Sequence, residues 1–175
     1  TFLRSKRNAE KIKETLNPYL LEYQNFIQQN IYLSYRLCNL FKSDLSQRSK
    51  ALVEQFGSLI QRDNSFAFEP VLQNQFEQLR QFIELSIQAN YAIDAKNKRF
   101  VESELKTFKK FFDQVESTPL TDEQRVSSII FEDRNLLVAA AGSGKTSTIV
   151  GKVGYALLTG LYKPEEILVL AFNKN

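Results

Sequence analysis

The stretch LLVAAAGSGKTS, at residues 136–147, limits the possible folds of this chain more than any other part of its sequence. An apolar run leads into two glycines, and a lysine and a threonine follow the second glycine directly. A pair of glycines alone would indicate only a tight turn between a strand and a helix. The lysine and the threonine, with an apolar run before them and a helical pattern after them, favour a loop that binds phosphate.

Each residue type in this phosphate loop, residues 139–146, has a physical reason. The loop fits the pattern G-x-x-x-x-G-K-[ST], with alanine at its first glycine. The two glycines let the backbone point successive amides at phosphate oxygens. The lysine brings positive charge to the β- and γ-phosphates, and the threonine offers a hydroxyl to Mg²⁺. With Lys145 and Thr146 as catalytic residues, the predicted nucleotide site comprises Ala139, Ala140, Ala141, Gly142, Ser143, Gly144, Lys145, Thr146 and Ser147.

The segments around the phosphate loop follow the order of a parallel α/β unit. Thr121, with Gln124 three residues later, has the form of a capping box and predicts the start of a short helix. The run LLVAA, the glycine turn, a helix over about 145–158 and the run ILVLAF at 167–172 come next. Strand, turn, helix and strand in this order are typical of a parallel sheet covered by helices.

The first 115 residues predict a series of helices without a sustained strand pattern. Asn17 and Pro18 have the form of a helix start, and Pro70 begins a later helix after the loop RDNSFAFEP. The apolar residues expected to face a core are Leu21, Phe26, Ile27, Ile31, Leu37, Leu40, Leu45, Leu52, Phe56, Leu59, Ile60, Leu72, Phe76, Leu79 and Ile83.

A charged stretch at residues 96–116, KNKRFVESELKTFKKFFDQVE, carries a second apolar seam. Its members alternate spacings of four and three: Val101, Leu105, Phe108, Phe112 and Val115. Such a seam needs a partner helix. The seam could dock a protein or a nucleic acid, or it could pack inside a helical bundle of the same chain. Its short length favours the bundle.

The composition excludes several kinds of chemistry. The chain has no histidine and one cysteine, so a zinc site of Cys and His ligands and a Cys/His or Ser/His nucleophile are excluded within these residues. The absence of a long apolar run and of a secretory signal predicts a reduced, cytoplasmic setting without a membrane partner. A formal net charge of +3 is compatible with a nucleic-acid partner but is not specific to one.

The ends of the sequence predict that it is a piece of a longer protein. It opens on Thr1 rather than methionine, and it stops at Asn175 directly after an apolar run. A change of composition near residue 117 predicts a domain boundary. We expect a helical N-terminal region at 1–117 and an incomplete ATP-binding domain at 118–175.

Three segments, PLTDEQR, NLLVAAAGSGKT and ILVLAFNKN, resemble in order and spacing the N-terminal motor segment of the superfamily 1 UvrD-like DNA helicases. The resemblance covers roughly residues 97–175. It implies an α-helical N-terminal bundle followed by the start of an α/β RecA-like domain, the fold of P-loop NTPases. It also implies an ATP-dependent DNA helicase or translocase of DNA repair, with ATP and Mg²⁺ as cofactors and single-stranded or partly duplex DNA as partner.

The resemblance implies roles for single residues. Gln124 matches the family's Q motif, whose side-chain amide pairs with the adenine edge, although capping a helix would also explain this residue. The phosphate loop matches the family's Walker A form A-x-x-G-x-G-K-T, with Ala140 in place of a more common glycine. Phe172 and Asn173 match motif Ia, which contacts single-stranded DNA. Phe172 is explained equally well as the last core residue of a strand.

The family also needs groups that lie outside this sequence. An acidic pair on a later strand holds Mg²⁺ and orients water, and arginines of a second motor domain stabilise the transferring phosphoryl group. In the family's sheet, that later strand lies between the strands expected at 136–140 and 167–172. We therefore expect either a segment of a larger folded chain or a poorly ordered C-terminal third. The segment alone is expected to be inactive.

Two functions of other classes stay open at this point. An ATPase could remodel a protein complex, such as RNA polymerase, through a protruding helical arm in the first 115 residues. The seams broken by Pro18, Gly57 and Pro70 favour a compact bundle over such an arm. The segment could also serve only as an accessory binding module.

Overall fold

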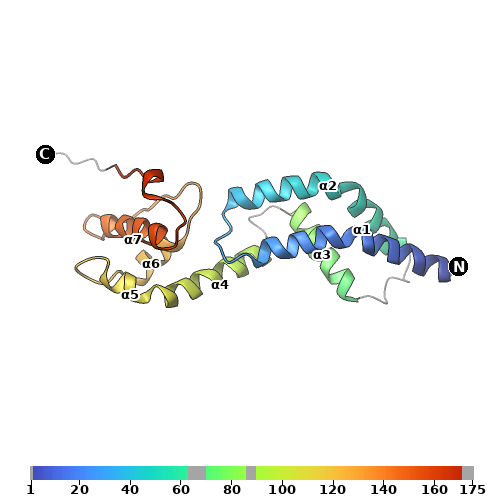
Figure 1. The fold of residues 1–175 in the computed structure, drawn as a ribbon, viewed down its shortest axis with the longest axis horizontal. Coiled ribbons are helices and arrows are strands. Elements are labelled where there is room, and N and C mark those ends of the chain that lie inside the picture. The colour runs from blue at the N-terminus through green and yellow to red at the C-terminus, as the bar shows by residue number, and fades with distance from the viewer. Residues whose placement is uncertain (1, 63–69, 86–89, 171–175) are drawn as a thin grey trace. The chain divides into compact units, whose positions relative to one another are not determined.

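The computed structural model describes residues 2–62, 70–85 and 90–170 of the chain. Two compact units make up the chain, Thr1–Asn97 and Lys98–Asn175. Every regular element in the described ranges is a helix, as Figure 1 shows. None of these helices is both long enough and apolar enough to cross a membrane.

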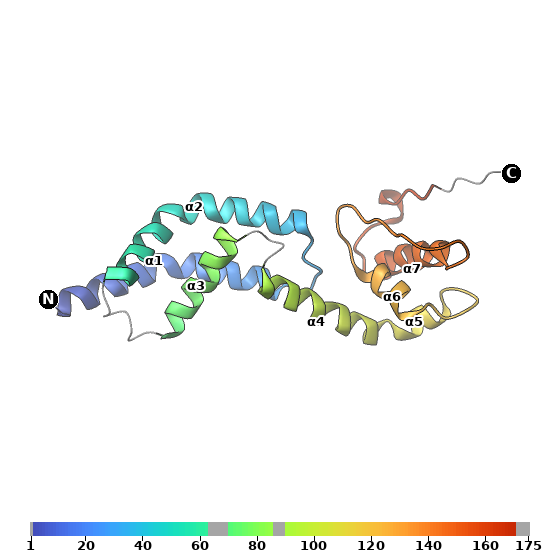
Figure 2. The ribbon, with the colours of Figure 1, turned by 180° about the vertical axis from the view of Figure 1, so that it is seen from behind.

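The first unit contains α1 (Phe2–Gln28), α2 (Tyr35–Arg62), α3 (Pro70–Glu84) and the first part of α4 (Tyr91–Thr107). Helices α1, α2 and α3 pack against one another, and they lie side by side in both views of the ribbon (Figures 1 and 2). The core between them consists of Leu16, Leu20, Tyr23, Phe26, Leu33, Cys38, Leu45, Val53, Phe76, Leu79, Phe82 and Ile93. The α-helical N-terminal region expected from the sequence is thus confirmed.

Helix α1 runs through Pro18, so the helix start predicted at Asn17 and Pro18 is wrong. A proline inside a helix removes one hydrogen bond and costs about 3 kcal/mol. Leu16 and Leu20, on the two sides of the proline, are both buried in the same core. Burial of a leucine side chain contributes about 2 kcal/mol. Continuous packing of this face therefore outweighs the local cost of the proline.

Part of the predicted core also differs from the observed one. Leu21, Ile31 and Leu40 are exposed, whereas Leu20 and Tyr23 are buried. Neighbouring helical residues lie about 100° apart around the helix axis, so a core face predicted at Leu21 is rotated by that angle from the observed face at Leu20. The side chains of Phe56, Leu59, Ile60 and Leu72, and most of the loop predicted at 62–70, lie outside the described residues. The other predicted core residues are buried or pack against the core: Phe26, Ile27, Leu37, Leu45, Leu52, Phe76, Leu79 and Ile83.

An asparagine side chain fixes the turn between α1 and α2. The Leu33 amide donates to Asn97 Oδ1 at 2.9 Å, and Asn97 Nδ2 donates to the Leu33 carbonyl at 3.0 Å. Leu33 is buried, so its main-chain groups need partners inside the protein. Asn97 supplies both partners from α4, and this pair ties the start of α4 to the first unit.

The second unit contains the rest of α4, α5 (Lys109–Gln114), α6 (Asp122–Ile129), α7 (Lys145–Leu158) and the 3₁₀-helix η3 (Pro164–Glu166). Tyr155 of α7 lies at the centre of its core. The centroid of the Tyr155 ring lies 5.2 Å from that of Phe108 in an edge-on contact and 6.1 Å from that of Phe112 in a stacked one. The Tyr155 hydroxyl donates to Glu104 at 2.6 Å, and burial, together with this contact, raises the pKa of the tyrosine.

The second apolar seam finds its partner inside the same unit. Its five members, Val101, Leu105, Phe108, Phe112 and Val115, belong to the cluster around Tyr155. The helix that carries the seam is interrupted at Phe108, where α4 gives way to α5. The seam therefore packs within the chain, as the bundle interpretation expected. The boundary predicted near residue 117 falls inside this second unit.

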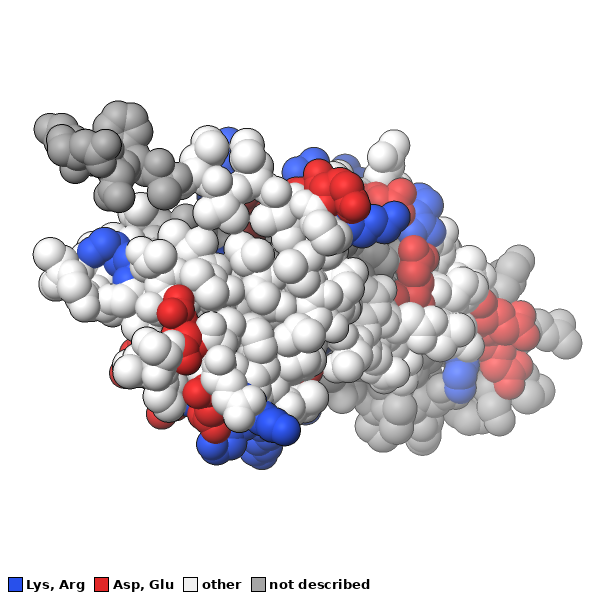
Figure 3. Space-filling model, turned by 60° about the vertical axis from the view of Figure 1, so that its left-hand side comes forward, with Lys and Arg blue, Asp and Glu red and all other residues white. Residues whose placement is uncertain are grey.

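The strands predicted at 136–140 and 167–172 are absent from the described residues, so the start of a RecA-like sheet is not observed. Several of their described apolar side chains face solvent, with exposed fractions of 88% for Leu136, 84% for Val138, 81% for Leu168 and 83% for Leu170. Figure 3 shows a broad uncharged area with charged side chains around its margins. A parallel strand needs a hydrogen-bonded neighbour and cover on both faces. The described residues of the two segments pair with no other strand, and most of their apolar side chains lie uncovered, so no sheet forms in this part of the structure.

Candidate nucleotide-binding site

The phosphate loop turns into α7 through two glycines with left-handed backbone angles. Gly142 has φ +75° and Gly144 has φ +83°, values that other residues rarely adopt. Gly144 has a second constraint, because an added Cβ would lie 2.3 Å from Gln124 Nε2. No atom lies within 4 Å of a Cβ added to Gly142. Backbone conformation alone therefore explains Gly142, whereas conformation and close packing both explain Gly144.

Lys145 opens α7 and reaches back across the loop. Its ammonium donates to the carbonyl oxygens of Ala139 at 3.0 Å and of Ala140 at 2.7 Å. The Ser143 hydroxyl also donates to the Ala140 carbonyl, at 2.7 Å. An ammonium has three donors and prefers charged acceptors, so phosphate oxygens would compete well for this exposed group. The loop thus places its positive charge within the turn that the glycines form.

The first two threonines after Lys145 differ in exposure: Thr146 faces solvent, and Thr148 faces the interior. Thr146 is exposed, and its side chain makes no hydrogen bond within the described part of the chain. Thr148, which the sequence analysis did not single out, is buried and donates to the Gly144 carbonyl at 3.1 Å. The sequence offers one signal for this contact. Thr148 lies four residues after Gly144, and a threonine hydroxyl on a helix can donate to the carbonyl four residues before it.

Gln124 links the start of α6 to the phosphate loop. The capping box is confirmed: Thr121 N donates to Gln124 Oε1 at 2.9 Å, and Gln124 N donates to the Thr121 hydroxyl at 3.4 Å. In addition, Gln124 Nε2 donates to the Ser143 carbonyl at 3.1 Å. A primary amide has two N–H donors and two lone pairs on its oxygen. One donor and one lone pair therefore stay available for a ligand.

A close crossing of α6 and α7 holds this arrangement together. Ser128 is fully buried, and its hydroxyl lies within hydrogen-bond distance of the carbonyls of Gln124, at 2.8 Å, and of Thr148, at 3.2 Å. A Cβ added to Gly151 would lie 2.6 Å from Leu120 Cδ1 and 2.9 Å from Ser128 Oγ. Neither residue was predicted from the sequence, although a glycine inside an amphipathic helix is a signal of close approach.

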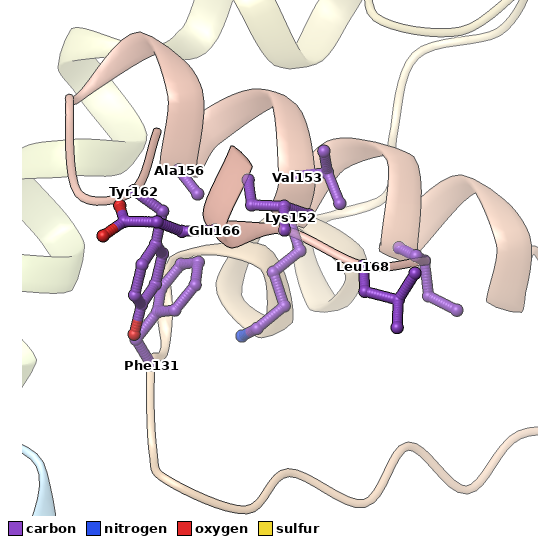
Figure 4. A pocket seen from close by; sticks show the side chains of 9 residues that line it. Phe131, Lys152, Val153, Ala156, Tyr162, Glu166 and Leu168 are labelled. Atoms are coloured by element: carbon purple, nitrogen blue, oxygen red, sulfur yellow. The ribbon is translucent and has the colours of Figure 1, made fainter. Parts of the chain in front are cut away.

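A cavity of about 250 Å³ is lined by Ile149, Lys152, Val153 and Ala156 of α7, together with Phe131 and residues of the segment after α7. Lys152 crosses it, as Figure 4 shows, and places its nitrogen 4.1 Å from the centre of the Phe131 ring. The ammonium donates to the carbonyl oxygens of Ser127, at 3.0 Å, and of Ile130, at the end of α6. Burial lowers the pKa of Lys152 to about 8. This lysine satisfies helix-end carbonyls of α6, and nothing places it at the phosphate loop.

The structure thus brings together Gln124, the phosphate loop and the start of α7. Residues 139–147 form one turn around the Lys145 ammonium and the left-handed glycines. Phe172 and Asn173, predicted to contact DNA, lie outside the described residues. Asp, Glu and Cys side chains form no cluster of metal-ligand size in the described ranges. The prediction of Thr146 as a metal ligand stays a prediction.

Comparison with known proteins supports the resemblance seen in the sequence. Residues 120–175 match the family model of the UvrD/REP helicase N-terminal domain. The chain is 42% identical over 78 residues to DNA helicase IV of Escherichia coli strain K12, a match that covers 45% of this chain and 11% of the relative. No solved structure matches the chain significantly. The C-terminal part of the chain is therefore similar to the N-terminal segment of UvrD-like superfamily 1 helicases, as predicted.

Proposed function

We propose that this chain carries the first part of the ATP site of a DNA helicase that moves along single strands. The contact between Gln124 and the phosphate loop is the main support for this proposal. It joins a residue that can read a base to a loop that can hold phosphates. The similarity of residues 120–175 to the UvrD/REP helicase N-terminal domain supports the same function.

The residues present fit ATP and Mg²⁺. Main-chain amides of the phosphate loop and the positive end of α7, a helix of 14 residues, suit phosphate oxygens. Lys145 would bind the β- and γ-phosphates, and Thr146 would bind Mg²⁺ through its exposed hydroxyl. The remaining donor and acceptor of Gln124 match the adjacent acceptor and donor of the adenine edge. When bound, Mg²⁺ would neutralise charge on the phosphates during phosphoryl transfer.

Hydrolysis and DNA movement require more than these residues. The resemblance to UvrD-like helicases implies that an acidic pair and the arginines of a second motor domain would complete the site. Phe172 and Asn173 would contact single-stranded DNA through motif Ia. We therefore propose that this segment binds ATP but does not hydrolyse it alone, and that the whole protein couples hydrolysis to translocation.

The experiment is a substitution of Lys145 in the full-length protein. Lys145→Ala should abolish DNA-stimulated ATP hydrolysis while the circular dichroism spectrum and the melting temperature stay unchanged. Lys50→Ala, which removes an exposed lysine of α2, is the matched control and should retain full activity. Normal turnover in Lys145→Ala would contradict the proposed function.

A second candidate function has one observation in its favour. Helices α1 and α2 are 27 and 28 residues long, longer than the broken seams of the sequence indicated. Long paired helices suit an arm that engages a protein partner, such as RNA polymerase, during ATP-driven remodelling. A strand-displacement assay and a pull-down with the polymerase would separate the two functions. Unwinding without polymerase capture would favour the helicase.

A further inference from the structure

An ion pair joins the first turn of α6 to the helix before it. Arg125 donates from Nη2 to Asp113 Oδ1 of α5 at 2.8 Å. The Arg125 side chain is 12% exposed, whereas the Asp113 side chain is 31% exposed, so water reaches the carboxylate but hardly the guanidinium. Lys109 donates to the other oxygen of Asp113 at 2.6 Å. Lys109 and Arg125 together lower the pKa of Asp113, so the carboxylate stays charged.

The same arginine fixes the turn that leads into α6. Arg125 Nε donates to the Leu120 carbonyl at 2.7 Å, and the Leu120 amide donates to the Phe112 carbonyl at 3.0 Å. The Leu120 side chain is buried against α7, next to Gly151. Both main-chain groups and the side chain of Leu120 are thus held, and the start of α6 is held with them.

This matters for the nucleotide site because Arg125 directly follows Gln124 in the first turn of α6. The helix has eight residues, too few for its own hydrogen bonds to fix its direction. The contact of Arg125 with Asp113 of α5 therefore contributes to the position of Gln124. From there the glutamine reaches Ser143 in the phosphate loop.

We propose that Asp113 and Arg125 are positioning residues for adenine recognition. Asp113 acts through Arg125, which holds the first turn of α6 so that Gln124 meets both the phosphate loop and the base. This inference rests on the proposed ATP site and extends it to α5, which lies before residues 120–175 of the family match. It predicts an effect on the choice of base that a purely stabilising ion pair would not have.

The experiment compares ATP with GTP in the full-length protein. Asp113→Asn keeps the shape of the side chain and removes its charge. The KM for ATP should rise about three- to tenfold, whereas kcat and the KM for GTP should stay within about twofold. The preference for ATP over GTP should therefore fall. Asp113→Glu, which keeps the charge, should restore part of the preference.

Two further variants make the result specific. Asp44→Asn is the matched control, because it removes a 2.6 Å pair with Arg48 in the first unit and should leave the preference unchanged. In a Gln124→Ala background, Asp113→Asn should have no additional effect on the KM for ATP. An unchanged preference in Asp113→Asn, or an equal loss for both nucleotides, would overturn the inference while the ATPase stands. A wild-type protein without ATP hydrolysis would overturn the proposed function and this inference together.

Discussion

Gln124 Nε2 donates to the main-chain oxygen of Ser143 at 3.1 Å, so the first turn of α6 is hydrogen-bonded to the phosphate loop. The same nitrogen lies 2.3 Å from the position that a Cβ on Gly144 would take. The glutamine and the glycine therefore constrain each other. A side chain at position 144 would displace the amide that caps α6.

Gly144→Ala should destabilise the protein more than Gly142→Ala. Both substitutions force alanine into a left-handed conformation at a cost of about 1–2 kcal/mol. Only the alanine at 144 also meets Gln124, whereas the alanine at 142 meets open space. Urea unfolding of the nucleotide-free variants would measure the difference. In a Gln124→Ala background the two alanines should cost the same, and a persistent difference would show that another contact is responsible.

Ser128→Ala should lower the free energy of unfolding by about 1 kcal/mol. The Ser128 hydroxyl is fully buried and lies 2.8 Å from the Gln124 carbonyl and 3.2 Å from the Thr148 carbonyl, so its loss removes a bond between α6 and α7. Ser127→Ala, one residue earlier on the same helix, is the matched control. Equal stabilities of the two variants in thermal melts would rule out a role for this hydroxyl.

Local features of this chain followed from the sequence because neighbouring residues determine them. The capping box at Thr121 and Gln124 and the bounds of α7 depend on residues within one or two turns. The position of α1 depends instead on which face meets α2 and α3, so the local signal at Pro18 was misleading. The contact of Gln124 with Ser143 joins residues that are far apart in the sequence, and no local pattern predicts it.

The two missing strands illustrate a different limit. The segments that begin near Leu136 and Leu168 have the composition of buried parallel strands, yet both leucines are exposed. A helix satisfies its main-chain groups internally, whereas a strand depends on a neighbour that is distant in the sequence. Helices α6 and α7 therefore form, while the described residues do not form the sheet that the pattern indicates.

Lys152 should make the stability of the protein depend on pH above pH 8. Burial lowers its pKa to about 8, while the unfolded chain keeps the proton to about pH 10.4. Between these values the unfolded state binds more protons, so stability rises with pH, and the cost of the buried charge is fully present below pH 8.

The substitution Lys152→Met tests this dependence, because it keeps an apolar stem and removes the charge. Urea unfolding should be measured at about pH 7 and about pH 10. The rise in the free energy of unfolding between these pH values should be about 2 kcal/mol smaller in this variant than in the wild type. Lys163→Met removes an exposed lysine and should behave like the wild type. An identical rise in all three proteins would show that Lys152 titrates alike in both states.

The segment 118–175 should fail to fold independently, although the composition changes near residue 117. Phe108 and Phe112 cover the Tyr155 ring, and Glu104 accepts its hydroxyl hydrogen at 2.6 Å. A peptide without 98–117 would expose this tyrosine together with Leu120, and of the phenylalanines in the cluster it would keep only Phe131. Circular dichroism melts should show a cooperative transition for 98–175 and none for 118–175. A cooperative transition of the shorter peptide would place the folding boundary at 117 and make α4 and α5 dispensable.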